Sequence, residues 1–94
     1  MDKQEAQRLI GEQLLLYREK PYSELCKMVG AEPITGEITA QSGNWYQFEV
    51  EAYWDDKRGG NIRVGGVIDD GGLRVYSPLC IDFIKAPDDT FVGE

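Results

Sequence analysis

Hydrophobic and polar residues alternate most regularly between Trp45 and Trp54, in the longest stretch of this kind in the chain. One set of alternate positions is apolar and comprises Tyr46, Phe48, Val50, Ala52 and Trp54. The other set mixes aromatic and polar residues and comprises Trp45, Gln47, Glu49, Glu51 and Tyr53. Because successive side chains of a strand point to opposite faces, this alternation predicts a strand with one buried and one wetter face.

The N-terminal part of the chain has helical spacing instead. Over residues 2–19 apolar side chains recur three or four positions apart and form one face, which predicts an amphipathic helix. The aspartate at its start can cap it, and Glu5 three residues later completes a capping-box pattern. Pro21 ends the helix, since proline lacks an N–H and clashes with the preceding turn. A second, shorter helix is expected over 21–29, with Gly30 in the left-handed conformation after it.

Three more segments alternate like strands, at residues 34–40, 61–69 and 73–77. Turn sequences separate the strands, and Asp70-Gly71 is the strongest hairpin signal among them. The opposite pairs predicted from these turns are Ala40 with Asn44, Ile38 with Tyr46, Gly36 with Phe48, Ala52 with Ile62, Val50 with Val64, Glu51 with Arg63, Ile68 with Leu73, Gly66 with Val75 and Gly65 with Tyr76. All of these pairings keep the same faces together, which favours a four-stranded antiparallel meander. Gly65-Gly66 suggests a bulge or bend in the sheet.

The expected fold class is therefore α+β, with both helices packed on one face of the sheet. We expect a single domain over residues 1–94, with a helical part at 1–30, the meander at 34–77 and an extended C-terminal tail at 78–94. Phe91-Val92 is expected to anchor that tail. This arrangement resembles the helix wrapped by a curved sheet of the cystatins. The resemblance is one of shape, because no cystatin protease-binding motif is present, and it implies no function.

The last third of the chain, from Gly65 onward, resembles the C-terminal part of a family of small uncharacterised bacterial proteins. The similarity rests on the Asp-Asp-Gly-Gly turn at 69–72 and on the segments Pro-Leu at 78–79, Asp-Phe-Ile at 82–84, Ala-Pro-Asp at 86–88 and Phe-Val-Gly-Glu at 91–94. The resemblance implies a bacterial, cytoplasmic protein. It implies no activity.

Charge narrows the range of partners. The net charge is −7, and all of it comes from residues 31–94, because the basic and acidic residues of 1–30 balance. Lysine and arginine are not clustered, so we expect no binding to nucleic acid, and an anionic membrane surface would repel the chain. No signal peptide and no transmembrane run is recognisable, which favours a cytoplasmic location with Cys26 and Cys80 as reduced thiols.

Catalytic chemistry finds little support in the composition. The chain has no histidine, the commonest general base and transition-metal ligand, and it has no Cys-x-x-Cys motif. Its adjacent aspartates fall in predicted turns, where an Asp side chain usually accepts a hydrogen bond from the nearby backbone. Its Gly-Gly pairs precede no helix and so form no phosphate loop. We therefore predict no enzyme activity, no catalytic residue, no metal site and no cofactor.

A non-catalytic protein-interaction domain is the favoured function. Its contact surface would be the sheet face that the helices leave uncovered, used for a second copy or for another protein, with Trp45, Glu49, Glu51, Tyr53, Arg63, Arg74 and Tyr76. One alternative is a small-ligand pocket between helix and sheet, lined by Tyr17, Tyr22, Tyr46 and Trp54. Another is an acidic inhibitor or immunity-type protein for a basic toxin or enzyme.

Overall fold

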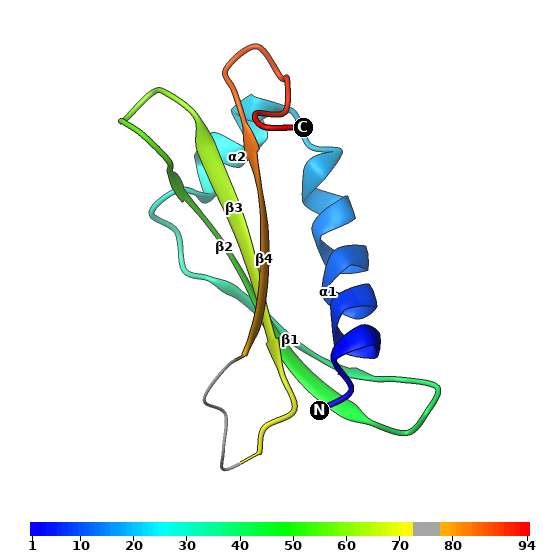
Figure 1. Cartoon of the computed structure of the whole chain (residues 1–94). Helices are drawn as coiled ribbons and strands as arrows, with labels where there is room; N and C mark the ends of the chain where they lie inside the picture. Colours follow the sequence, from blue (N-terminus) through cyan, green and yellow to red (C-terminus); the bar gives the residue numbers. More distant parts are fainter. Residues whose placement is uncertain (73–77) are drawn as a thin grey trace.

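The computed structural model describes residues 1–72 and 78–94. Two helices precede four strands: α1 (Lys3–Arg18), α2 (Tyr22–Met28), β1 (Ile34–Thr39), β2 (Trp45–Trp54), β3 (Ile62–Asp69) and β4 (Leu79–Lys85). The strands form one antiparallel sheet in the order β1-β2-β3-β4, and both helices pack on the same face (Figure 1). The α+β class and the meander predicted from the sequence are thus confirmed.

The helix boundaries follow the predicted signals. The Asp2 carboxylate accepts a hydrogen bond from the backbone N–H of Glu5 at 3.0 Å and so caps α1. Pro21 separates the two helices and occupies the N-cap position of α2. Gly30 has a φ of 83° after the second helix, a left-handed conformation that glycine adopts without strain. Both helices therefore begin and end within one or two residues of where they were expected.

The first hairpin has the predicted register, and the second does not. Ile38 pairs with Tyr46, as expected. In the second hairpin Ala52 pairs with Val64 rather than with Ile62, a shift of two residues. The reason lies in the loop, where the Asp56 carboxylate accepts hydrogen bonds from the backbone N–H groups of Lys57 and Asn61 at 2.7 and 2.9 Å and closes a tight turn. A shift of two leaves every side chain on its predicted face.

The fourth strand is the largest correction. The expected strand at 73–77 lies outside the described residues, and β4 is formed by the segment that was expected to be a tail. Ile68 pairs with Leu79 instead of Leu73, and Gly66 pairs with Ile81 instead of Val75. The connection after Asp70-Gly71 is therefore longer than a two-residue hairpin turn.

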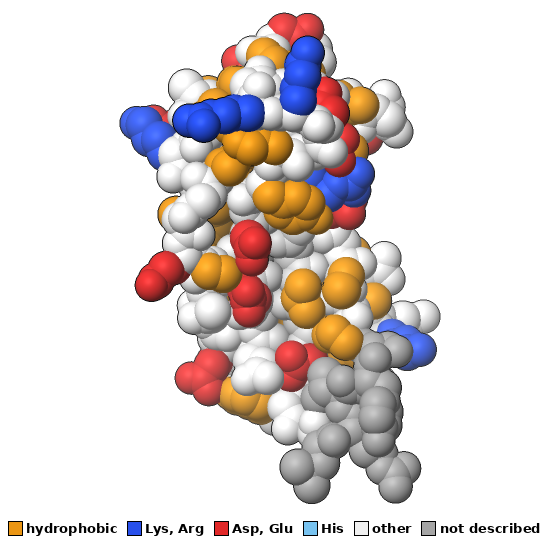
Figure 2. Space-filling view, turned by 90° about the vertical axis from the view of Figure 1, so that its left-hand side faces the viewer, with side chains coloured by type: hydrophobic (Ala, Val, Ile, Leu, Met, Phe, Trp, Pro, Cys, Tyr) orange, Lys and Arg blue, Asp and Glu red, His pale blue; other side chains and the backbone are white. Residues whose placement is uncertain are grey.

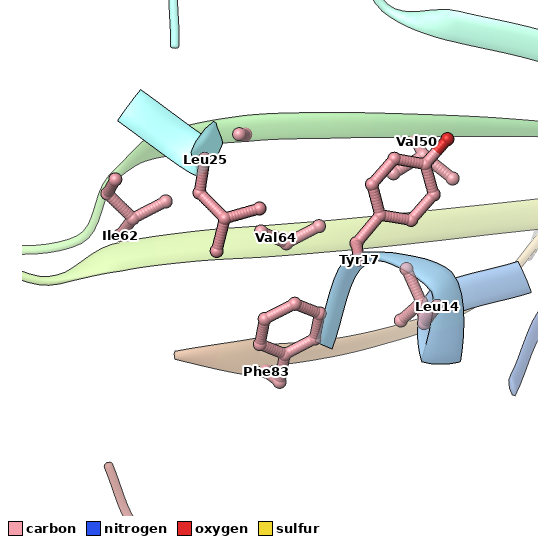
Figure 3. Close-up of a cluster of buried hydrophobic side chains, with 8 residues drawn as sticks. Leu14, Tyr17, Leu25, Val50, Ile62, Val64 and Phe83 are labelled. Atoms are coloured by element: carbon pink, nitrogen blue, oxygen red, sulfur yellow. The ribbon is translucent and has the colours of Figure 1, made fainter. Parts of the chain in front are cut away.

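Two hydrophobic clusters fill the space between helices and sheet. One lies under the C-terminal half of α1 and under α2, and it contains Leu14, Tyr17, Leu25, Val50, Ala52, Ile62, Val64 and Phe83 (Figure 3). The other lies under the N-terminal half of α1 and contains Ala6, Leu9, Ile10, Ala40, Tyr46 and Ile68. Between them α1 rests directly on Gly66, where an added Cβ would lie 2.9 Å from Ile10 Cγ1. Strand pairing is continuous through Gly65 and Gly66, so the predicted bulge is absent there. The lack of a side chain at Gly66 instead allows α1 to approach the sheet closely.

The C-terminal segment closes one end of the molecule. The buried Lys85 donates hydrogen bonds through Nζ to the carbonyl oxygens of Arg18 and Lys20, at 2.9 and 2.7 Å, and thereby caps the end of α1. The Arg18 guanidinium lies 4.1 Å from the centroid of the Phe91 ring and binds both carboxylate oxygens of Glu94, at 2.6 and 2.9 Å. The predicted anchor at Phe91 is confirmed, since this ring packs against the core, whereas Val92 is exposed.

A hydrogen-bond network holds the other end. Oε1 of Glu5 accepts hydrogen bonds from Ser42 Oγ, Asn44 Nδ2 and Tyr46 Oη, at 3.0, 3.0 and 2.8 Å, and so joins α1 to the β1–β2 hairpin. These donors, Asn44 foremost, lower the pKa of Glu5. Burial, together with the bond to Glu5, raises the pKa of Tyr46 to about 12.

Replacing Tyr46 with Phe should lower the free energy of unfolding at pH 7 by about 1 kcal/mol, because one buried hydrogen bond is lost. Since folding raises the pKa of the Tyr46 hydroxyl above its ordinary value of about 10, the protonated hydroxyl stabilises the fold below pH 10, and this contribution disappears as the pH rises to about 12. Urea unfolding measured at several pH values should show wild type and variant converging in this alkaline range. The control is Tyr53→Phe, whose hydroxyl bonds to no described residue. A constant difference up to pH 12 would contradict the assignment.

Candidate functional site

The sheet face opposite the helices is uncovered, and the register places its side chains in five rows. From the β1–β2 hairpin end these rows are Thr39–Trp45, Glu37–Gln47–Asp69, Thr35–Glu49–Val67–Cys80, Glu51–Gly65–Asp82 and Tyr53–Arg63–Ile84. We call this set the uncovered face. Figure 2 shows this side of the molecule, where acidic side chains lie next to hydrophobic ones near its centre. The uncovered face thus combines two exposed aromatic side chains with several carboxylates.

The two aromatic residues of the uncovered face lie at opposite ends of β2. Trp45 is 37% exposed, and its ring packs on Gly71, where an added Cβ would lie 2.5 Å from Cζ3. Tyr53 is 44% exposed, and its ring lies beside Gly65, 3.9 Å from the position a Cβ would take. Tyr53 is therefore the freer aromatic surface of the two.

Arg63 is held between two carboxylates. Its Nε and Nη2 bind Asp55 Oδ1 at 2.8 and 2.7 Å, and its Nη1 binds Asp82 Oδ2 at 2.9 Å. Both carboxylates raise the pKa of the guanidinium, with Asp55 as the larger cause. The predicted pairing of Arg63 with Glu51 is wrong, because Arg63 lies opposite Tyr53 in the observed register. The guanidinium is therefore already paired within the chain.

Two hollows lie in the uncovered face and meet at Glu49 and Val67. The wide hollow, about 540 Å³ in volume, is bordered by Thr35, Glu37, Gln47, Glu49, Val67 and Asp69. The narrow hollow, about 250 Å³, is bordered by Glu49, Glu51, Tyr53, Val67, Cys80 and Asp82. Gly65 has no side chain to fill the floor of the narrow hollow. Each hollow is thus rimmed by at least three carboxylates.

The structure brings five of the seven predicted contact residues together on this face: Trp45, Glu49, Glu51, Tyr53 and Arg63. Arg74 and Tyr76 lie outside the described residues. The sequence argument missed Val67, Cys80 and Asp82, the last two because β4 was taken for a tail. The alternation within Leu-Cys-Ile-Asp-Phe-Ile-Lys at 79–85 was the signal that could have found them.

The predicted pocket residues do not line a common cavity. Tyr46 is buried in the cluster under the start of α1, while Trp54 packs on the other cluster. The Tyr22 hydroxyl donates a hydrogen bond to the carbonyl oxygen of Gly60 at 2.6 Å. Tyr17 borders an open groove between the end of α1, α2 and the start of β1, with a volume of about 380 Å³. Apolar side chains such as Met28 and Val50 line it together with Lys20, Glu24 and Lys27. Tyr46 contributes to a separate hollow of about 400 Å³ beside Asp2 and Trp45.

The described part of the chain contains no group of three or more cysteine, aspartate or glutamate side chains arranged to hold a metal ion. Cys26 is half-buried against the core and Cys80 is exposed, and both are free thiols. Neither helix in residues 1–72 and 78–94 is long and apolar enough to cross a membrane.

No family model, curated protein or solved structure matches this chain. The resemblance of its last third to small bacterial proteins therefore remains a prediction, as does the likeness of its shape to the cystatins.

Proposed function

We propose that this chain is a non-catalytic protein-interaction domain that binds its partner on the uncovered face of the sheet. The observation that carries the proposal is the exposure of Tyr53 beside an unfilled hollow on a face that no other element of the described chain covers. The opposite face carries both helices. Aromatic side chains that remain exposed beside a hollow are typical anchors of protein interfaces. Its cystatin-like shape and its membership of the bacterial family belong to the same proposal and carry no function of their own.

Replacing Tyr53 with Ser should weaken partner binding at least about tenfold, because a hot-spot aromatic of an interface typically contributes 2 kcal/mol or more. The measurement is capture of interacting proteins from the native host, followed by titration of the captured protein against purified wild type and variant. The far-ultraviolet circular dichroism should be unchanged, since the side chain is exposed.

The matched control is Leu16→Ser, which removes a 58% exposed apolar side chain from α1 on the other side of the molecule. This variant should bind as the wild type does. The proposal is wrong if Leu16→Ser abolishes binding while Tyr53→Ser leaves it intact.

The groove beside Tyr17 supports a second candidate, a site for a small ligand. Its floor is apolar, and the rim carries both lysine and glutamate side chains, so an amphiphilic molecule of modest size would suit it. The two candidates respond differently to the same variants, because a ligand in this groove would be unaffected by Tyr53→Ser.

A further inference from the structure

We infer that the partner presents an extended basic segment to the uncovered face, with arginine or lysine at alternate positions seated in the two hollows. The inference rests on the proposed function and names the chemistry of its partner.

Charge is the first support. Among the outward-facing side chains of the described strands, five are acidic and one is basic: Glu37, Glu49, Glu51, Asp69, Asp82 and Arg63. The Arg63 guanidinium is occupied by two carboxylates, and Asp69 accepts a hydrogen bond from Gln47 Nε2 at 2.7 Å. The carboxylates of the three glutamates, by contrast, form no ion pair or hydrogen bond with residues 1–72 or 78–94. They form a negative field that attracts a cationic side chain and repels an acidic one.

Spacing is the second support. Glu49 and Glu51 are two residues apart on β2, and Glu37 lies one row further along the sheet on β1. Rows two residues apart are separated by about 6.5–7 Å, which is also the repeat of alternate side chains in an extended peptide. Basic side chains at alternate positions of such a segment would therefore reach the wide hollow and the narrow hollow in turn. At the end of this line the exposed Tyr53 ring offers its face to a guanidinium.

The same charges disfavour a second copy of this chain as the occupant. A two-fold dimer formed through the uncovered face would bring the glutamates of one protomer against those of the other. With Arg63 already paired, the described part of this face has no free cation to offset that repulsion. A basic heterologous partner meets no such penalty.

The test uses synthetic peptides of about seven residues in which arginine alternates with threonine. The isotope-labelled chain is titrated with this peptide and observed by NMR, at low and at high salt. We expect amide shifts confined to the four strands, and affinity that falls with salt. Glu49→Gln combined with Glu51→Gln should weaken binding about three- to tenfold, as for partly exposed ion pairs. Gly65→Val, which fills the narrow hollow, should weaken it as well.

One set of controls tests whether the position of the charge on the chain matters, and a second set tests the charge and spacing of the peptide. Glu12→Gln combined with Glu19→Gln removes the same charge from α1 and its C-cap and should bind as wild type. A peptide with citrulline in place of arginine should not bind, and one with its arginines contiguous should bind more weakly. Equal weakening by both glutamate pairs, or equal binding of the citrulline peptide, would overturn the inference.

Failure of the inference is separable from failure of the proposed function. If the native partner depends on Tyr53 but binds through an acidic or apolar segment and is insensitive to salt, the uncovered face remains the site and the basic segment is wrong. The same holds if light scattering shows a dimer that Tyr53→Ser dissociates. If arginine peptides shift only the amides of α1 and α2, the inference of a basic segment is wrong, while the proposed function still depends on the effect of Tyr53→Ser on the native partner.

Discussion

Replacing Lys85 with Met should lower the free energy of unfolding by about 2–4 kcal/mol, because the carbonyl oxygens of Arg18 and Lys20 lose their shared donor in a buried position. Methionine is unbranched and only one heavy atom shorter than lysine, so the loss reports mainly the hydrogen bonds and the charge rather than a cavity. The Lys85 ammonium group also lies 4.8 Å from the centroid of the Phe91 ring, a contact that the variant loses. In a domain of this size such a change lowers Tm by about 10 °C or more. Urea unfolding and calorimetry measure the two quantities.

The control for Lys85→Met is Lys27→Met. The Lys27 side chain is 74% exposed and bonds only to Glu24 within its own helix, at 3.3 Å. Its replacement should change the free energy of unfolding by no more than about 0.5 kcal/mol. If the two variants unfold alike, water rather than Lys85 satisfies the end of α1, and β4 is not fastened to the helix in the way described.

The N-terminal half of the fold could be predicted from the sequence because its signals are local. A capping aspartate, a proline and a glycine delimit the helices, and each acts within one turn of the backbone. In the first hairpin the three-residue loop allows one register only, and Ala40 N–H indeed donates to the Asn44 carbonyl at 2.8 Å.

Both errors of strand pairing have one physical origin. Alternation defines the face on which a residue lies, but it does not distinguish partners whose positions differ by an even number of residues. Between β2 and β3 the register depends on the loop, where the Asp56 carboxylate accepts a hydrogen bond from the backbone N–H of Asn61. The pattern of residues in the sequence does not predict this contact. For the last strand, two successive segments both alternate, and the sequence alone offered no reason to prefer the later one.

The errors in strand pairing affected part of the candidate site. Residues of β2 were placed on the uncovered face correctly, because a register shift of two residues leaves every side chain on the same face of the sheet. Asp82 was missed because β4 was not predicted, and its ion pair with Arg63 was missed for the same reason. The hollows could not be foreseen, because each arises from side chains of three strands and the narrow one also from the missing side chain of Gly65.

Replacing Gly66 with Val should lower the free energy of unfolding by about 3 kcal/mol, near the upper end of the range for overpacked cores. An added Cβ would lie 2.9 and 3.0 Å from Cγ1 and Cδ1 of Ile10 and 3.2 Å from Cδ2 of Leu14. Both side chains are buried, so neither can turn aside without disturbing the packing of α1. Valine would force the helix away from the sheet at the point where the two hydrophobic clusters meet. Urea unfolding and NMR spectra of the variant would show the loss.

Gly65→Val is the matched control, because it makes the same chemical change at the neighbouring residue on the opposite face. Any gain in strand propensity or loss of conformational freedom in the unfolded state is common to the two variants. The difference between their free energies of unfolding therefore reports the contact with α1. At Gly65 only the Tyr53 ring comes within 4 Å of an added Cβ, at 3.9 Å. We therefore expect Gly65→Val to be neutral or slightly stabilising, and to lose affinity for the arginine peptide while Gly66→Val loses stability. Equal destabilisation by the two substitutions would mean that strand geometry, and not the close approach of the helix, requires glycine here, and the assignment of the two sheet faces would then be wrong.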